Sequence, residues 1–269
     1  MQDFSSYRRV VVKVGTSTLT HSTGHLDLRR IETLVRVLAD FRNRGREIVL
    51  VSSGAVSAGI ARLGVDHRPR STEEKQALAA VGQSQLMKLY ERLFSDYGYC
   101  VGQILLTRDV MDSPVRRKHA EQTFETLLSL GCIPIVNEND SVSSEGLNFG
   151  GNDTLSAYVA MVCHADLLVN LSDVDGLYDR DPRRDASACL IHQVDCVTDD
   201  LLAIAGGAGT ERGTGGMATK LEAARMVTEA GISMIIANGA DPLILYNITD
   251  GHKFGTFFSA QQLHQTERV

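Results

Sequence analysis

Residues 9–14 read Arg-Val-Val-Val-Lys-Val, and this stretch decides the class of fold. Branched apolar side chains occupy nearly every position, whereas a strand with one face in water would alternate apolar and polar residues. A continuous apolar run is typical of a parallel sheet that is covered on both faces. Similar short runs are predicted as strands at 48–51, 101–106, 133–136, 167–171 and 234–237.

Helical patterns lie between these runs. Residues 31–41 carry apolar side chains at helical spacing, and Gly45 follows as a stop signal. A longer helix is predicted from Ser71, because Ser71 and Glu74 fit a capping box. Further helices are predicted at 117–130, 154–164 and 218–230. The alternation of strands and helices predicts an α/β fold around a mainly parallel sheet.

The domain organisation follows from length and composition. The chain has 269 residues, only 5 prolines, no low-complexity linker and no internal repeat. We therefore expect a single domain over residues 1–269, with an N-terminal lobe over about 1–170 and a C-terminal lobe over about 171–269.

Composition and charge exclude several classes of protein. Hydrophobic residues make up 43% and charged residues 22%, which is ordinary for a globular protein. The formal net charge of −6 gives no overall attraction to nucleic acid or to an anionic membrane surface, so neither is expected as a partner. The N-terminus lacks a signal peptide, no run is long enough to span a membrane, and the five cysteines are scattered. These features predict a cytoplasmic protein.

Polar and glycine residues follow the predicted strands. In open parallel sheets a ligand binds beyond the carboxyl ends of the strands. Gly15 follows the first run, Ser53 and Gly54 follow the second, and residues 137–140 and 172–176 follow two later runs. This clustering indicates a ligand site along that edge.

Three candidate parts of such a site each have a functional and a structural interpretation. Lys13, inside an apolar run, is either a phosphate-binding lysine or a solvent-facing lysine on an edge strand. Ser53 and Gly54 either begin a helix that binds an anion or form a plain serine cap. Asp153 either belongs to the site or caps a helix that starts at Thr154.

Residues 206–220 form a glycine-dense loop that runs into a helix. The loop has no Walker A spacing, and its loose dinucleotide fingerprint does not follow a strand. A phosphate-cradling loop with Lys220 as a point charge fits better. No histidine or acidic motif has zinc or calcium spacing. Two lysines, glycine loops and no obvious nucleophile indicate phosphoryl transfer.

Several short motifs occur in an order that identifies a family. They read VKVGTS (12–17), SSGA (52–55), LAAVGQS (78–84), LLT (105–107), NEND (137–140), GNDTLSA (151–157), DGLY (175–178) and GTGGMATK (213–220). As an ordered set, over about residues 9–258, they resemble the glutamate 5-kinase branch of the amino-acid kinase family. The resemblance implies a three-layer αβα sandwich and transfer of the ATP γ-phosphoryl group to the γ-carboxylate of L-glutamate, the first step of proline biosynthesis.

The resemblance also implies roles for individual residues. Lys13, Lys220 and Asp153 would be catalytic, with Asp153 orienting the lysines. The glutamate-binding residues in the N-terminal lobe would be Ser53, Gly54, Asn137, Asp140 and Asn152. The ATP-binding residues would be Lys13, Gly15, Ser172, Asp173, Thr214, Gly215, Gly216, Met217, Ala218, Thr219 and Lys220. Mg²⁺ would bridge the ATP phosphates, with no metal ligand assigned to the protein.

The chain departs from the family pattern in two places. It ends at Val269, so we expect no C-terminal PUA domain. Gly151 stands where the family usually has aspartate, which predicts weak glutamate binding unless Glu138 or Glu145 replaces that carboxylate. We further expect a homo-oligomer, either a dimer or a tetramer, and proline as a feedback inhibitor. Two other functions remain open: a kinase of the same fold for another small carboxylate, carbamate or a nucleotide, and a non-catalytic amino-acid-binding module.

Overall fold

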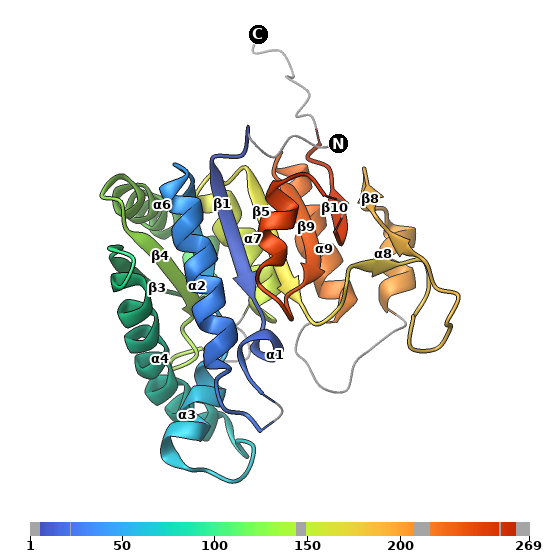
Figure 1. Ribbon diagram of the computed structural model, residues 1–269. Coiled ribbons are helices and arrows are strands. Elements are labelled where there is room, and N and C mark those ends of the chain that lie inside the picture. The colour runs from blue at the N-terminus through green and yellow to red at the C-terminus, as the bar shows by residue number, and fades with distance from the viewer. Residues whose placement is uncertain (1–5, 22, 144–148, 207–215, 253, 262–269) are drawn as a thin grey trace.

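One sheet runs through the centre of the computed structural model, which describes residues 6–21, 23–143, 149–206, 216–252 and 254–261. Within these ranges the sheet has 8 strands in the order β3-β4-β2-β1-β5-β9-β10-β8 (Figure 1). The strands are β1 (Arg9–Val14), β2 (Glu47–Val51), β3 (Val101–Leu106), β4 (Ile133–Glu138), β5 (Leu167–Ser172), β8 (Gln193–Val194), β9 (Ser233–Asn238) and β10 (Thr256–Phe258). All neighbours are parallel except β10, which is antiparallel to β9.

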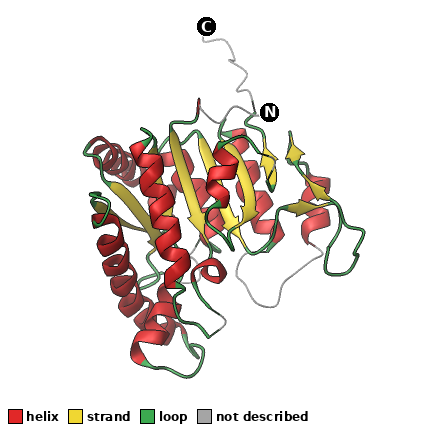
Figure 2. Ribbon diagram, viewed as in Figure 1, coloured by secondary structure: helices red, strands yellow, loops and turns green. Residues whose placement is uncertain are grey.

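Helices cover both faces of the sheet, which gives the three layers (Figure 2). One face is packed against α2 (Leu28–Asn43), α3 (Ala55–Leu63), α4 (Thr72–Ser95) and α10 (Ile244–Thr249). The other face is packed against α5 (Arg108–Asp112), α6 (Pro114–Ser129), α7 (Asn152–Val162), α8 (Asp199–Gly206) and α9 (Met217–Glu229). A short helix, α1 (Thr16–Leu19), follows β1, and a hairpin of β6 (Leu177–Tyr178) and β7 (Leu190–Ile191) stands beside the sheet.

The side chains of β1 alternate between the two cores. Val10, Val12 and Val14 belong to the core under α2 and α4, whereas Val11 belongs to the core under α7 and α9. Because successive side chains in a strand point to opposite faces, Lys13 faces the α7 and α9 side. The alternation of side chains along β1 therefore places Lys13 on the same face of the sheet as Asp153 of α7.

The predicted strands are confirmed. The bounds 9–14 and 101–106 match those of β1 and β3, and the ends of the others differ by at most two residues. The sequence did not predict the short elements β6, β7, β8, β10, α1, α5, α8 and α10. None is longer than eight residues, which is too short for periodicity to identify. The predicted helix 117–130 begins earlier, at Pro114, after Ser113 as its N-cap. At α4, Ser71 accepts the Glu74 backbone N–H as predicted. The Glu74 carboxylate, however, accepts from the Arg70 N–H, so only half of the capping box forms.

Helices α3 and α4 lie in backbone contact. A Cβ added at Gly82 would lie 1.7 Å from the carbonyl oxygen of Ala55, and one added at Gly59 would lie 2.0 Å from that of Leu78. Only glycine allows two backbones to approach so closely. The contact fixes α4 against the segment that carries Ser53 and Gly54.

None of the helices in the described ranges combines the length and the apolar character that a membrane span requires.

Candidate active site

A single carboxylate joins two lysines beside the end of β1. Lys13 Nζ donates to Asp153 Oδ1 at 2.6 Å, and Lys220 Nζ donates to Asp153 Oδ2 at 3.1 Å. The exposed fractions are 6% for Lys13, 2% for Asp153 and 5% for Lys220. The three predicted catalytic residues, from β1, α7 and α9, therefore meet in one buried cluster.

The position of β1 explains the burial of Lys13. The strand pairs with β2 on one side and β5 on the other, so Lys13 lies opposite Val51 and Asn170. The alternative of a solvent-facing lysine on an edge strand is wrong.

Asn170 is a member of this cluster that the sequence analysis missed. Its amide donates to Asp153 Oδ1 at 2.8 Å, and its carbonyl oxygen lies 3.4 Å from Lys13 Nζ. The side chain is completely buried on β5. A signal was available, because Asn170 is a polar residue inside an apolar run, as Lys13 is, and the parallel register places the two opposite each other.

The charges of this cluster shift the pKa values of its members. Burial raises the pKa of Asp153, but the charges of Lys13 and Lys220 outweigh it and hold that pKa well below its usual range. Burial is the main cause that lowers the pKa of Lys13, and the charge of Lys220 adds to the effect. One negative and two positive charges leave the cluster with an excess positive charge, which suits a phosphoryl group.

Asp153 does not cap its helix. Helix α7 begins at Asn152, its N-cap is Gly151, and no side chain accepts a capping hydrogen bond there. The Asp153 carboxylate instead faces the lysines, and Thr219 Oγ1 also donates to it at 3.1 Å. The cap reading is therefore wrong, and so is the predicted helix start at Thr154.

A second cluster surrounds Asn152. Its amide donates to the carbonyl oxygen of Ser52 at 2.9 Å, to Ser53 Oγ at 2.7 Å and to Asn137 Oδ1 at 3.1 Å. Asn137 in turn donates to Gln83 Oε1 on α4 at 2.9 Å. Three predicted glutamate-binding residues are thus joined in one network, which begins next to Asp153.

Ser53 is not a helix cap. The N-cap of α3 is Gly54, whose φ of 94° lies in the left-handed region, and no side chain caps the helix. Ser53 Oγ is turned toward Asn152 instead, so the plain-cap reading is wrong.

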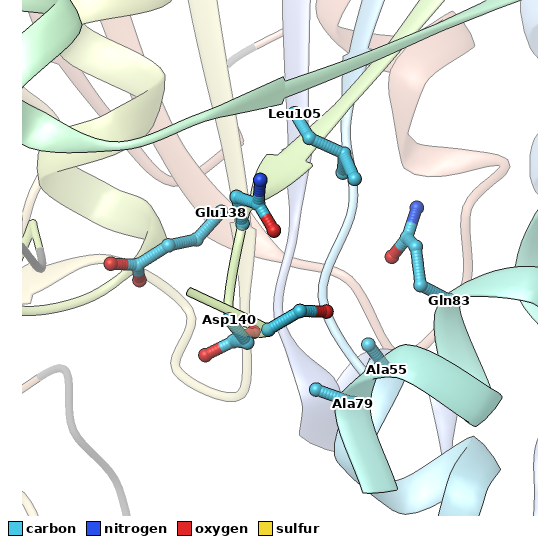
Figure 3. A pocket seen from close by; sticks show the side chains of 8 residues that line it. Ala55, Ala79, Gln83, Leu105, Glu138 and Asp140 are labelled. Atoms are coloured by element: carbon cyan, nitrogen blue, oxygen red, sulfur yellow. The ribbon is translucent and has the colours of Figure 1, made fainter. Parts of the chain in front are cut away.

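Asp140 lies in a small pocket between α4 and the segment after β4. The pocket is lined by Ala55, Ala79, Gln83, Leu105, Glu138, Asn139, Asp140 and Ser141 (Figure 3). Asp140 also pairs with Lys75 of α4, with 3.3 Å between Nζ and Oδ1. Asp140, which the resemblance implies as a glutamate-binding residue, is therefore already paired with a cation.

Glu138 does not stand in for a missing carboxylate. Its side chain points away from Ala79 and Gln83 (Figure 3). Its Oε1 accepts from Ser143 Oγ and from the Phe149 N–H, both at 3.1 Å. Burial raises the pKa of Glu138. The Glu138 carboxylate thus holds the segment after β4. Glu145, the other acid that could replace the missing carboxylate, lies outside the described residues.

The predicted ATP-binding residues lie around the ends of β1 and β5 and the start of α9. A Cβ at Gly15 would lie 3.6 Å from Lys13 Nζ. Ser172 Oγ donates to Asp173 Oδ1 at 3.1 Å, and the charge of Asp173 acts on Lys13. Gly216 is the N-cap of α9, and Met217, Ala218, Thr219 and Lys220 form its first turn. Thr214 and Gly215 lie outside the described residues.

A family model described as "Amino acid kinase family" matches residues 8–238. The curated proteins similar to this chain include the glutamate 5-kinase of Clostridium perfringens (strain 13 / Type A), 49% identical over 259 residues, which cover 95% of this chain and 96% of that protein. The glutamate 5-kinase of Symbiobacterium thermophilum is 54% identical over 254 residues, covering 94% and 97% of the two chains.

Solved structures share the fold at low sequence identity. The UMP kinase of Bacillus anthracis has a TM-score of 0.64 at 17% identity, covering 95% of this chain and 97% of that one. The carbamate kinase of Giardia lamblia bound to AMP-PNP has a TM-score of 0.67 at 14% identity, covering 95% and 99%. These likenesses bear out the predicted αβα sandwich and carry no information on substrate.

Proposed function

The chain belongs to the amino acid kinase family, and we propose that the Lys13–Asp153–Lys220 cluster is the phosphoryl-transfer centre of a glutamate 5-kinase. The enzyme transfers the γ-phosphoryl group of ATP to the γ-carboxylate of L-glutamate and produces L-glutamyl 5-phosphate, the first step of proline biosynthesis. The observation that carries the role of the cluster is one buried carboxylate bonded to both lysines.

The chemistry requires charge neutralisation rather than a base. A γ-carboxylate oxygen attacks the γ-phosphorus and the bond to the β-phosphate oxygen breaks, so no proton has to leave the nucleophile, which is ionised at neutral pH. Asp153 suits a positioning role, because its lowered pKa keeps it from accepting a proton. Lys13 and Lys220 would stabilise the charge on the transferring oxygens.

The metal would arrive with the nucleotide. In the described residues no group of three or more acidic, histidine or cysteine side chains could form a metal cage. Mg²⁺ is commonly held by substrate phosphates with one or two carboxylates, and Asp173, close enough to act on Lys13, is suited to that part. When bound, Mg²⁺ would neutralise phosphate charge.

The two substrates would lie on the two sides of Asp153. Glutamate would be held by Ser53, Gly54, Asn137, Asp140 and Asn152 in the N-terminal lobe. ATP would be held by residues that include Gly15, Ser172, Asp173 and the 214–220 segment, most of them in the C-terminal lobe. We also propose a cytoplasmic homo-oligomer that proline inhibits.

The test is a substrate panel. Purified protein with ATP, Mg²⁺ and millimolar L-glutamate should form an acyl phosphate that hydroxylamine traps as a hydroxamate. Carbamate and UMP should give no ATP consumption above background. A protein that gives no hydroxamate would be the amino-acid-binding module, and one that consumes ATP with another acceptor would be a different kinase of this fold.

A further inference from the structure

The residues that line the Asp140 pocket do not balance all the charges of a bound glutamate. Bound glutamate carries two carboxylates and one ammonium. The γ-carboxylate belongs at Lys13 and Lys220, and the ammonium at Asp140. The α-carboxylate is attached to the same carbon as the ammonium, so it must lie close to Asp140. Yet the described residues that line the pocket include two acids, Glu138 and Asp140, and no lysine or arginine.

Lys75 supplies a cation at the edge of this pocket. On α4, Lys75 precedes Ala79 by four residues and Gln83 by eight, and residues four apart lie on one face of a helix. Because Ala79 and Gln83 line the pocket, Lys75 continues the same wall, as its contact with Asp140 shows. The side chain is 53% exposed, so it can move without leaving a buried cavity.

We propose that Lys75 binds the α-carboxylate of glutamate. The Lys75–Asp140 ion pair would part when substrate enters, and each partner would pair with the opposite charge of the amino-acid head group. The pocket is small, about 10 Å³ or roughly one water molecule, so a bound head group needs the room that opens when this ion pair parts. The network of Asn137 and Gln83 connects this head-group site to Asn152 and the transfer centre.

An alternative role for Lys75 predicts the opposite change in the glutamate KM. If Lys75 only occupies Asp140 in the empty enzyme, it competes with the substrate ammonium, and its removal should lower the glutamate KM. If Lys75 binds the α-carboxylate, its removal should raise that KM. This inference rests on the proposed function, since it names a contact of the same substrate.

The experiment compares Lys75→Met with the wild type on substrates that differ in one group. 4-Aminobutyrate is glutamate without the α-carboxylate, and glutarate is glutamate without the ammonium. The Lys75→Met enzyme should show a glutamate KM raised by about tenfold, the low end for a charged contact because the site is half-exposed, with kcat and the ATP KM unchanged. The inhibition constant of 4-aminobutyrate should not rise, so the preference for glutamate over this analogue should shrink by the same factor.

Controls separate this contact from a general effect. Lys75→Arg should retain most of the preference, and Lys88→Met, which changes an exposed lysine on the same helix, should leave both constants as in the wild type. Asp140→Asn should instead shrink the preference for glutamate over glutarate. Two results would overturn the assignment of Lys75 while leaving the kinase activity established. In the first, Lys75→Met raises the glutamate KM and the 4-aminobutyrate inhibition constant by equal factors. In the second, Lys75→Met lowers the glutamate KM. A wild type that forms no hydroxamate would overturn the proposed function instead.

Discussion

Asp153 is the residue on which both lysines depend, since each oxygen of its carboxylate accepts from one of them. Substitution of one lysine leaves the carboxylate with the other lysine and with Asn170. Substitution of Asp153 would leave two buried cations without their shared partner, which is far more costly. Each lysine can therefore be substituted singly at a lower cost in stability than Asp153.

Lys13→Met and Lys220→Met should each lower kcat by roughly a hundredfold or more, if each lysine contributes about 3 kcal/mol to the transition state. Because both side chains are buried and paired, each variant should also lose some stability. Steady-state kinetics and thermal unfolding measure the two effects separately. A near-normal kcat in either variant would show that its lysine is structural.

Asn170→Asp should move the acidic limb of the kcat–pH profile to higher pH. A second carboxylate beside Asp153 disfavours ionisation of both, so the pair holds a proton at pH values where Asp153 alone has none. Asn170→Leu should lower kcat by about tenfold without moving that limb, because it removes the hydrogen bond that orients Asp153 and adds no charge. If the kcat–pH profiles of both variants coincide with that of the wild type, Asn170 contributes only to packing of the core.

Lys13 could be recognised from sequence because one charge interrupts an apolar strand. Asp153 could not be assigned from sequence alone, because an acid near a helix start fits a cap as well as a site. Its role depends on where α7 begins, and Gly151 sets that point. Helix ends follow from the conformation of one or two residues, which periodicity does not reveal.

Gly151 lies at φ 137° and ψ 164°, a conformation that is essentially restricted to glycine. Gly151→Asp, which would restore the carboxylate common in the family, should therefore cost about 1–3 kcal/mol of stability. It should also displace Asn152 and Asp153, so kcat should fall along with any change in the glutamate KM.

Gly150→Asn is a matched control, since Gly150 has a φ of 74°, which asparagine tolerates, and open space around its Cβ position. Unfolding by denaturant gives the two stabilities. A Gly151→Asp enzyme as stable as the wild type, with a lower glutamate KM, would mean that the backbone adapts.

The strand order could not be derived from the sequence, although the strands themselves could. The runs 9–14, 48–51 and 167–171 look alike, and only the packed structure places β1 between β2 and β5. The close approach of α3 and α4 at Gly59 and Gly82 could not be predicted either. From sequence alone, a glycine within a helix indicates only a residue that favours helix weakly.

The stability of the whole molecule should depend on Asp153 in acid. Its pKa is lowered in the folded protein, so the ionised group stabilises the fold above the ordinary value of 3.8, and this contribution is lost as the pH falls below it. The free energy of unfolding should decline more steeply in the wild type than in Asp153→Asn as the pH is lowered from 5 toward 2. Parallel curves, measured by urea unfolding, would contradict this.

The place of β1 at the centre of the sheet has a consequence for synthesis on the ribosome. Of the strands of this sheet, β1 is made before the others. Strand β2 can pair with one of its edges soon afterwards, but its other edge pairs with β5, whose residues begin only at Leu167. Until then the nascent chain displays an uncovered strand edge, which invites pairing with other chains. The strand that finally covers this edge also brings Asn170 to Lys13, so protection of the nascent sheet and the pairing of Lys13 with Asn170 occur in the same event, whereas Lys220 joins the cluster only after α9 has been made.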